Sequence, residues 1–358
     1  MLRISGNFAP LHNQYLFKLK LMIRYSYSVI FLILFSLIVA CKSEKKSTDT
    51  NSTENTDTLQ LTGGDTISFF GGEEVDDSPV VVGEGELYLT FNPITGKTYS
   101  TLMETTSRIS QTVNGEASSN IMNLSASNNL KVEQPNSDGY FIITSSVKNF
   151  KSKVTQGTIE VAFESGKKSA DQDADMLRQI MDCYIGMPVT IEMDKNARIL
   201  SMKGTDAIQK KIQTELGNDA VMVAQQMSDL NQEVLNSFVA FPRKAIKPGD
   251  TWITIDSVDM GGVPTIMKNV FTLKSFDSEL ANISVNSTFS VDKDYIRSIG
   301  GTGNEVTMTG GQNGTMQVDS HSGWTRSAEL KQDVKMHIED QGQLIDVSIT
   351  GNTTFKII

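Results

Sequence analysis

The stretch D-V-K-M-H-I-E, from Asp333 to Glu339, alternates polar and apolar residues one by one. I-D-V-S-I-T, from Ile345 to Thr350, repeats the pattern, and Asn282 to Phe289 shows it upstream. Successive side chains of a β-strand point to opposite faces, so this alternation is typical of strands with one solvent-exposed face and one face packed on the core. Sheets of this kind are antiparallel. These segments therefore predict a mainly antiparallel β structure.

Turn signals separate the predicted strands. Dipeptides that tolerate positive φ in tight hairpins occur at three places: Asn114–Gly115, Asp138–Gly139 and Asn313–Gly314. Val189 to Met193 and Ile199 to Met202 flank a further turn and predict one hairpin. The glycine-rich run from Gly300 to Gly314 precedes no helix, and we expect it to form a mobile hairpin or loop. The economical topology is a meander.

Two segments have helical periodicity instead. From Thr205 to Val239 the apolar residues recur at spacings near three and four, as one face of a helix requires. We expect Gly217 to divide this segment and Pro242 to end the pattern. A shorter helix is expected from about Ala170 to Tyr184. The predicted fold class is α+β, mainly antiparallel β, with a curved meandering sheet or sheets packed on a central helical insertion at about residues 205–240.

The N-terminus has the charge order of a secretory signal. Val29 to Ala40 is a run of twelve residues without a charge, and basic residues but no acidic one precede it. The run is too short for a spanning helix, which needs about 20 apolar residues. Small Ala40 precedes Cys41 in a sequence that resembles a lipobox. The match implies that residues 1–40 are a signal peptide and that acyl chains such as palmitate are attached to Cys41.

Lipidation of Cys41 predicts a lipoprotein tethered to a membrane on the periplasmic or outer-membrane side of a bacterial cell envelope. Stable anchoring takes more than one acyl chain, which multiple acylation of one cysteine supplies. Two alternatives stay open. The signal peptide could be unlipidated with an accidental cysteine, and translation could start at Met22 in place of Met1.

Residues 41–84 are polar and contain few large apolar side chains, so we expect a flexible tether before a folded domain at residues 85–358. Thr58 and Thr66 lie in Asp-Thr-aliphatic triplets that resemble an O-glycosylation sequon of Bacteroidetes and are candidate modification sites. The triplet Asp256-Ser257-Val258 is a third match.

Charge and cysteine content exclude several functions. Cleavage after Ala40 removes four basic residues and no acidic one, so the formal net charge falls from −10 to −14. An acidic domain argues against nucleic-acid binding, which needs clustered Lys and Arg. Once Cys41 is acylated, Cys183 has no partner for a disulfide or a zinc site, and we expect it to be a buried small hydrophobe.

No catalytic or cofactor motif is apparent. His321 and His337, the imidazoles of the mature chain, have no Cys or His at metal-ligand spacing, so no metal site and no cofactor are predicted. The sequence has no G-x-S-x-G motif, which forms the sharp turn that exposes a nucleophilic serine. Asp171, Asp173 and Asp175 imitate the start of a calcium loop, but a negatively charged helix N-terminus explains them better. We therefore expect no enzymatic activity.

Methionines gather around the predicted helical insertion, and flexible thioethers suit an adaptable apolar pocket as well as an ordinary core. The residues proposed for an apolar ligand groove are Met202, Met222, Met227, Leu230 and Val234.

Several motifs together resemble an uncharacterised family of Bacteroidetes lipoproteins: G-M-P-V-T-I-E-M-D at Gly186 to Asp194, S-M-K-G-T at Ser201 to Thr205, P-G-D-T-W at Pro248 to Trp252, and S-G-W-T-R-S at Ser322 to Ser327. The resemblance spans roughly Glu86 to Ile358 and implies a lipid-anchored envelope domain, without an established activity. At fold level, a curved antiparallel sheet with a helical insertion is similar to the half-barrel lipid-carrier lipoproteins.

The leading functional hypothesis is a non-enzymatic binding or carrier domain for a lipid or another apolar small molecule. It predicts a continuous apolar cavity beneath the helix from Thr205 to Val239. The alternative is a protein–protein interaction or structural module that contacts another envelope protein. It predicts a filled core and an exposed apolar patch.

Overall fold

A computed structural model describes residues 83–226, 239–260, 263–293, 305–340 and 343–358. The predicted signal peptide, the lipobox at Cys41, the tether, and the glycosylation candidates Thr58 and Thr66 lie outside the described residues.

The described part is built on one large antiparallel sheet of twelve strands. The strands are β1 (Thr98–Val113), β2 (Glu116–Val132), β3 (Phe141–Gln156), β4 (Ile159–Glu164), β5 (Pro188–Met193), β6 (Ile199–Lys203), β7 (Thr251–Met260), β8 (Val263–Phe276), β9 (Leu280–Val291), β10 (Glu305–Asp319), β11 (Thr325–Asp340) and β12 (Gln343–Ile357). The prediction of a mainly antiparallel β structure is confirmed.

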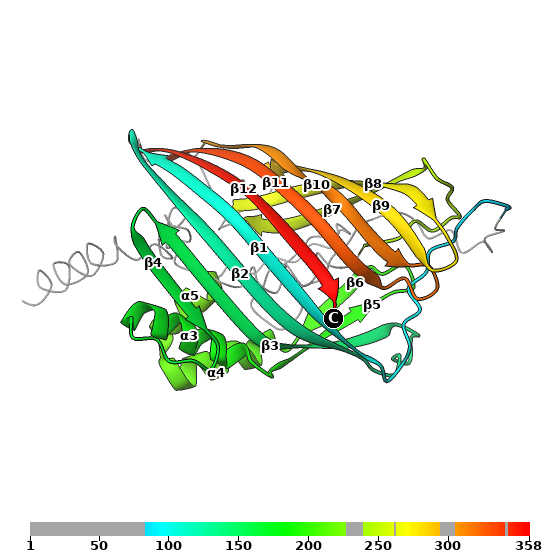
Figure 1. The fold of residues 1–358 in the computed structure, drawn as a ribbon, viewed down its shortest axis with the longest axis horizontal. Helices are drawn as coiled ribbons and strands as arrows, with labels where there is room; N and C mark the ends of the chain where they lie inside the picture. Colours follow the sequence, from blue (N-terminus) through cyan, green and yellow to red (C-terminus); the bar gives the residue numbers. More distant parts are fainter. Residues whose placement is uncertain (1–82, 227–238, 261–262, 294–304, 341–342) are drawn as a thin grey trace, which may run out of the picture.

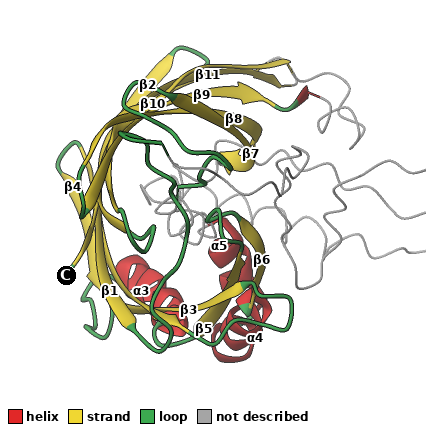
Figure 2. Cartoon of the chain, turned by 90° about the vertical axis from the view of Figure 1, so that its right-hand side faces the viewer, coloured by secondary structure: helices red, strands yellow, loops and turns green. Residues whose placement is uncertain are grey.

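The strand order is β6-β5-β3-β2-β1-β12-β11-β10-β9-β8-β7. Two meanders, β1–β3 and β7–β12, are joined because the last strand pairs with the first. On its far side β3 pairs with β5 through its first half and with β4 through its second half. The whole sheet is strongly curved and encloses a concave face (Figure 1, Figure 2).

Three helices of the described residues lie inside this curve beside β3, β5 and β6 (Figure 2): α3 (Gln172–Tyr184), α4 (Thr205–Leu216) and α5 (Asn218–Gln226). Helix α3 packs against β3 and β4, and α4 packs against α3 and α5. The prediction of a central helical insertion is therefore only partly right. Short connections hold these helices near the strands that precede them, at one side of the sheet.

Several local predictions are confirmed. The β1–β2 turn has positive φ at Asn114 (49°) and Gly115 (91°). Gly217, with φ of 90°, separates α4 from α5 as expected. In the β5–β6 turn the residue with positive φ is Ala197 (58°). These positions need backbone conformations that the surrounding strand and helix residues avoid.

The prediction of a turn at Asn313–Gly314, within a glycine-rich loop, is wrong. Both residues lie inside β10, which pairs with β9 and β11 on its two sides. A Cβ on Gly311 would lie 1.8 Å from the carbonyl oxygen of Ser287, and one on Gly314 would lie 1.9 Å from that of Glu329. The glycines therefore permit close approach of neighbouring backbones in a curved sheet.

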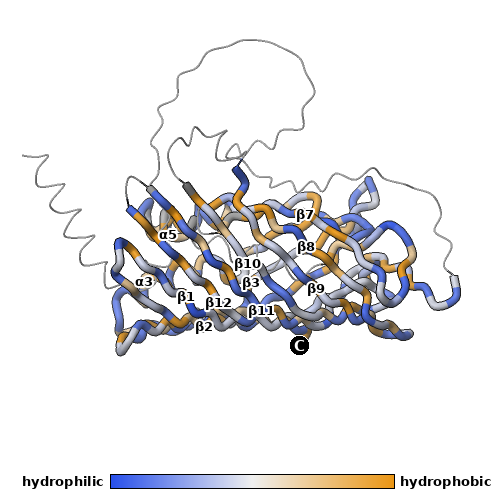
Figure 3. Tube along the Cα trace, turned by 90° about the horizontal axis from the view of Figure 1, so that it is seen from above, coloured by the Kyte–Doolittle hydropathy of each residue, from blue (hydrophilic) through white to orange (hydrophobic). Residues whose placement is uncertain are grey.

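The two faces of the sheet differ in polarity. Along β9, Ile283, Val285 and Phe289 point to the concave face and are buried, while the intervening residues are polar. Figure 3 shows the resulting alternation of hydrophilic and hydrophobic positions along the strands. One buried cluster unites the helices, the β1–β6 side, the segment 87–91 and part of β7–β11, where it includes Trp252, Phe271 and Ile283. A second lies on another part of the concave face of β8–β12: Val263, Met267, Phe289, Met308, Val334, Met336 and Val347.

Candidate ligand-binding site

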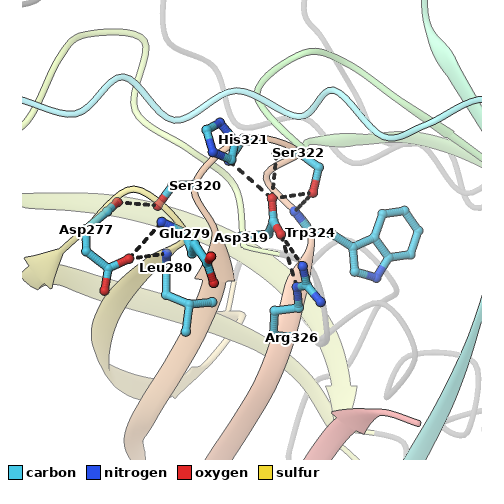
Figure 4. A network of polar contacts seen from close by, with 9 residues as sticks. All are labelled: Asp277, Glu279, Leu280, Asp319, Ser320, His321, Ser322, Trp324 and Arg326. Atoms are coloured by element: carbon cyan, nitrogen blue, oxygen red, sulfur yellow. Dashed lines mark hydrogen bonds and ion pairs between the residues drawn. The ribbon is translucent and has the colours of Figure 1, made fainter.

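His321 lies in the turn between β10 and β11, where Asp319 organises the backbone (Figure 4). Asp319 Oδ1 accepts hydrogen bonds from the backbone N–H groups of Ser322 (2.9 Å) and His321 (3.2 Å), and Oδ2 accepts one from Arg326 Nε (3.1 Å). Burial raises the pKa of Asp319, but the hydrogen bonds from Arg326 and Ser322 outweigh it and lower the pKa below its usual value. His321 is exposed, and the network fixes a turn that carries the buried Trp324.

The other candidate polar groups are also used structurally. His337 lies on the convex face, where its Nδ1 is 2.7 Å from Asp346 Oδ1. Asp171 caps α3 by accepting from the Ala174 N–H at 2.8 Å, as the helix-terminus interpretation requires. The described part of the chain contains no group of three His, Cys, Asp or Glu side chains that could hold a metal ion.

Cys183 is a buried small hydrophobe, as predicted: its exposed fraction is 2%. Burial, reinforced by the neighbouring Glu215 carboxylate, raises the pKa of the Cys183 thiol to about 11. The thiol is therefore protonated at neutral pH and a poor nucleophile.

Met202 is the member of the predicted groove whose side chain is described. It lines a cavity of about 40 Å³ between the sheet and helices α3 and α4, together with Ile208 of α4. That volume suits one or two water molecules and is too small for an acyl chain. The side chain of Met222 and the whole of Met227, Leu230 and Val234 lie outside the described residues, so the groove stays a prediction.

A different set of methionines meets on the concave face. Met267, Met308 and Met336 come from β8, β10 and β11 and are buried in the second cluster, and Met260 of β7 packs against it. The alternation of each strand could place these residues on one face. Pairing of neighbouring strands brings them together, and the sequence by itself did not indicate that Met308 and Met336 belong to this group.

A polar row crosses the same face beside this cluster. Strand pairing aligns its members across five adjacent strands: Thr254, Asn269, Ser287, Gln312 and Gln332. The row continues to Gly351 and Ser107 on β12 and β1, and the Ser107 hydroxyl is buried without a hydrogen-bond partner. The row separates the second buried cluster, called the methionine cluster below, from the first and larger one.

Asp256 adjoins this row and is half-buried. Its Oδ2 accepts hydrogen bonds from Asn269 Nδ2 (2.8 Å) and Thr254 Oγ1 (3.1 Å), and Asn269 Oδ1 accepts one from Ser287 Oγ (2.5 Å). Burial raises the pKa of Asp256 above its usual value, against the opposing effect of these hydrogen bonds. A carboxyl group thus lies on an otherwise uncharged stretch of the concave face.

Residues 138–325 match a protein family of unknown function, DUF6263. The chain belongs to this family. The matched region runs from the end of the β2–β3 connection to the start of β11, and so includes Asp256, Asn269, Ser287 and most of the methionine cluster. No curated protein gives a significant sequence match.

Solved structures similar to this DUF6263 chain include an outer membrane channel from Pseudomonas putida F1, at 9% identity over 78% of this chain and 100% of the other, with a TM-score of 0.20. Pseudomonas aeruginosa OccK7 (OpdD) matches at 6% identity over 73% and 99%, with a TM-score of 0.19. Acinetobacter baumannii Omp33 matches at 6% over 74% and 100%, with a TM-score of 0.14. At such scores the likeness carries no argument about this chain. None of the described helices is long and apolar enough to cross a membrane.

The raised pKa of Asp256 has a consequence for the stability of the DUF6263 domain. A raised pKa in the folded state means that folding favours the protonated carboxyl group of Asp256. The protonated group therefore contributes to the free energy of unfolding at low pH, and this contribution is lost as the pH rises through the pKa of the folded state. Asparagine is neutral at every pH and can still accept from Asn269. We expect Asp256→Asn to be more stable than the wild type at about pH 8, with a smaller difference at about pH 4.

Urea denaturation at both pH values measures this difference. The matched control is Asp333→Asn, because Asp333 is exposed on the convex face of β11. A stability gain for Asp256→Asn that is the same at both pH values would contradict the assignment of the effect to this carboxyl.

Proposed function

We propose that the mature chain is an envelope lipoprotein anchored through acylated Cys41, and that its DUF6263 domain is a non-enzymatic binding or carrier domain for an apolar ligand. The observation that carries this proposal is the methionine-rich apolar cluster on the concave face of a sheet whose convex face is polar along β9 and β11.

The convex face suits water. On β9 it presents Asn282, Ser284, Asn286, Thr288 and Ser290. On β11 it presents Glu329, Lys331, Asp333, Lys335, His337 and Glu339. Side chains of this kind favour an aqueous phase over hydrocarbon. The apolar side chains of these strands therefore point toward the concave face.

The concave cluster suits an adaptable apolar ligand. Met267, Met308 and Met336 supply unbranched, polarizable side chains that can repack around different shapes. Val334, which is fully buried, and Phe289 complete an apolar surface with a polar row at its border. Apolar pockets with a few placed polar groups are the usual form of small-molecule sites.

Native mass spectrometry of the mature chain, extracted in a mild detergent, tests this function. We expect a bound apolar adduct on the wild type and its loss from Met308→Glu, which places a charge in the concave cluster. The matched control is Thr309→Glu, because Thr309 is the next residue of β10 and is exposed on the other face. A wild type without any adduct would contradict the carrier function.

The same spectrum tests the anchor. Acylation of Cys41 predicts a mass above that of the polypeptide from residue 41 onward, and Cys41→Ser is expected to remove this increment.

One observation favours the second candidate, an interaction module for another envelope protein. Ile253 and Ile255 on β7 have exposed fractions of 53% and 57%, and β7 is the last strand of the sheet. Edge strands with exposed apolar side chains are sites at which other chains pair or pack. Crosslinking in membranes should capture a defined partner that an Ile253→Lys, Ile255→Lys double variant loses. A wild type that stays monomeric would count against this candidate.

A further inference from the structure

The hydrogen bonds around Asp256 hold its carboxyl group in one orientation. Two donors among the described residues, Asn269 Nδ2 and Thr254 Oγ1, bind the same oxygen, Oδ2. Ser287 Oγ in turn donates to Asn269 Oδ1, so the orientation of the Asn269 amide is fixed as well. Three adjacent strands thus cooperate to position one carboxylate and satisfy one of its two oxygens.

Beyond these polar partners, the surroundings of this carboxyl group are apolar. Strand pairing sets Asp256 opposite Met267, which in turn pairs with Phe289, and both of these side chains belong to the methionine cluster. On the other side of the polar row, Trp252 and Phe271 stack with their ring centroids 5.4 Å apart. Asp256 therefore stands at the border between two apolar surfaces.

No cation of these strands offsets the charge. The basic residues described in β7–β9 are Lys268 and Lys274, and both are exposed. Lys268 lies between the inward-facing Met267 and Asn269 in the sequence, so the alternation of the strand points it to the convex face. A partly buried carboxylate without an opposite charge is costly to keep, because its desolvation is not repaid by an ion pair.

We propose that Asp256 is the polar anchor of the concave site and that the ligand is an apolar molecule carrying a cationic amine. The proposal rests on the proposed function and specifies the ligand class. An ammonium group supplies both the missing opposite charge and hydrogen-bond donors for Asp256 Oδ1. A hydroxyl group supplies a donor without the charge, and a carboxylate would be repelled.

Three probes with eight carbon atoms each separate these cases: octylamine, octanol and octanoate. Isothermal titration calorimetry of the mature chain at neutral pH should give octylamine an affinity at least about tenfold higher than that of octanol, and octanoate the weakest. Asp256→Asn should reduce octylamine to the level of octanol while leaving octanol unchanged. Asp333→Asn, which removes an exposed convex carboxylate, should keep the wild-type order.

The outcomes distinguish the two proposals. If the wild type binds all three probes equally, the anchor role of Asp256 is overturned and the apolar-ligand function stands. If the wild type binds none, both fall. Because the wild-type order of affinities decides the anchor role, the test holds even if Asp256→Asn fails to fold. A variant that folds and keeps the preference for octylamine also overturns the role of Asp256.

Discussion

Gly314→Ala is expected to lower the free energy of unfolding by about 3 kcal/mol, because overpacking against backbone cannot be relieved by a side-chain rotation. The added Cβ would lie 1.9 Å from the Glu329 carbonyl oxygen and 2.9 Å from the Leu330 Cα on β11. Either the pairing of β10 with β11 opens or the sheet loses curvature at this point. Urea denaturation followed by circular dichroism measures the loss, which corresponds to a melting temperature lower by on the order of 5–10 °C.

Gly351→Ala is the matched control for this effect. It makes the same chemical change in β12 of the same sheet, but its Cβ would lie 3.2 Å from the Cβ of Ser107 and from the Thr106 carbonyl oxygen. A shift of a few tenths of an ångström accommodates it, so we expect a loss below about 1 kcal/mol. Equal losses for the two variants would show that close backbone approach is not the reason for glycine in β10.

Trp324→Ala is expected to cost about 3–5 kcal/mol, the range for removing a fully buried large aromatic side chain. The exposed fraction of Trp324 is 1%, and its ring stacks on Tyr99 at 4.1 Å between centroids and on Phe91 at 5.5 Å. The indole thus joins the start of β11 to β1 and to the segment that precedes β1. Its loss opens a cavity at this junction and frees that segment.

Two further variants make the Trp324 measurement specific. Trp324→Phe keeps one stacked ring, so we expect it to lose less than half as much free energy as Trp324→Ala. Tyr140→Ala removes an aromatic ring whose exposed fraction is 37%, and we expect almost no change in stability. A Trp324→Ala variant as stable as Tyr140→Ala would mean that the stacked cluster does not contribute to folding.

Local patterns in the sequence predicted many of the elements correctly. Two-residue alternation predicted β9, β11 and β12, and three-to-four spacing predicted α3 and the helical segment that begins at Thr205. The glycine at position 217 predicted the division of α4 from α5. These predictions succeed because alternation and helical spacing depend on neighbouring residues alone. The prediction of a turn at the glycines of β10 was wrong because it also used neighbouring residues alone. Glycine permits both a turn and a close approach of two backbones, and only the pairing partners of the strand distinguish the two.

The candidate site was harder to predict. Along β7, alternation puts Ile253 and Ile255 on one face and Thr254 and Asp256 on the other. Polarity alone would turn the isoleucines inward, yet they are exposed and Asp256 points to the concave face with the buried Trp252. The alternation of β7 therefore groups the site residues on one face, but polarity does not show which face of this strand is turned inward.

The sequence by itself determined the β-rich class, the presence of the helices α3, α4 and α5, the burial of Cys183 and the absence of a catalytic motif, because each follows from residue type and local spacing. Tertiary structure decided the rest. Pairing of β12 with β1 joined two meanders into one curved sheet. Pairing of neighbouring strands within β7–β11 collected methionines on one face and aligned a polar row beside them. Period-two alternation fixes which side chains share a face, but only strand order and curvature fix which face is enclosed.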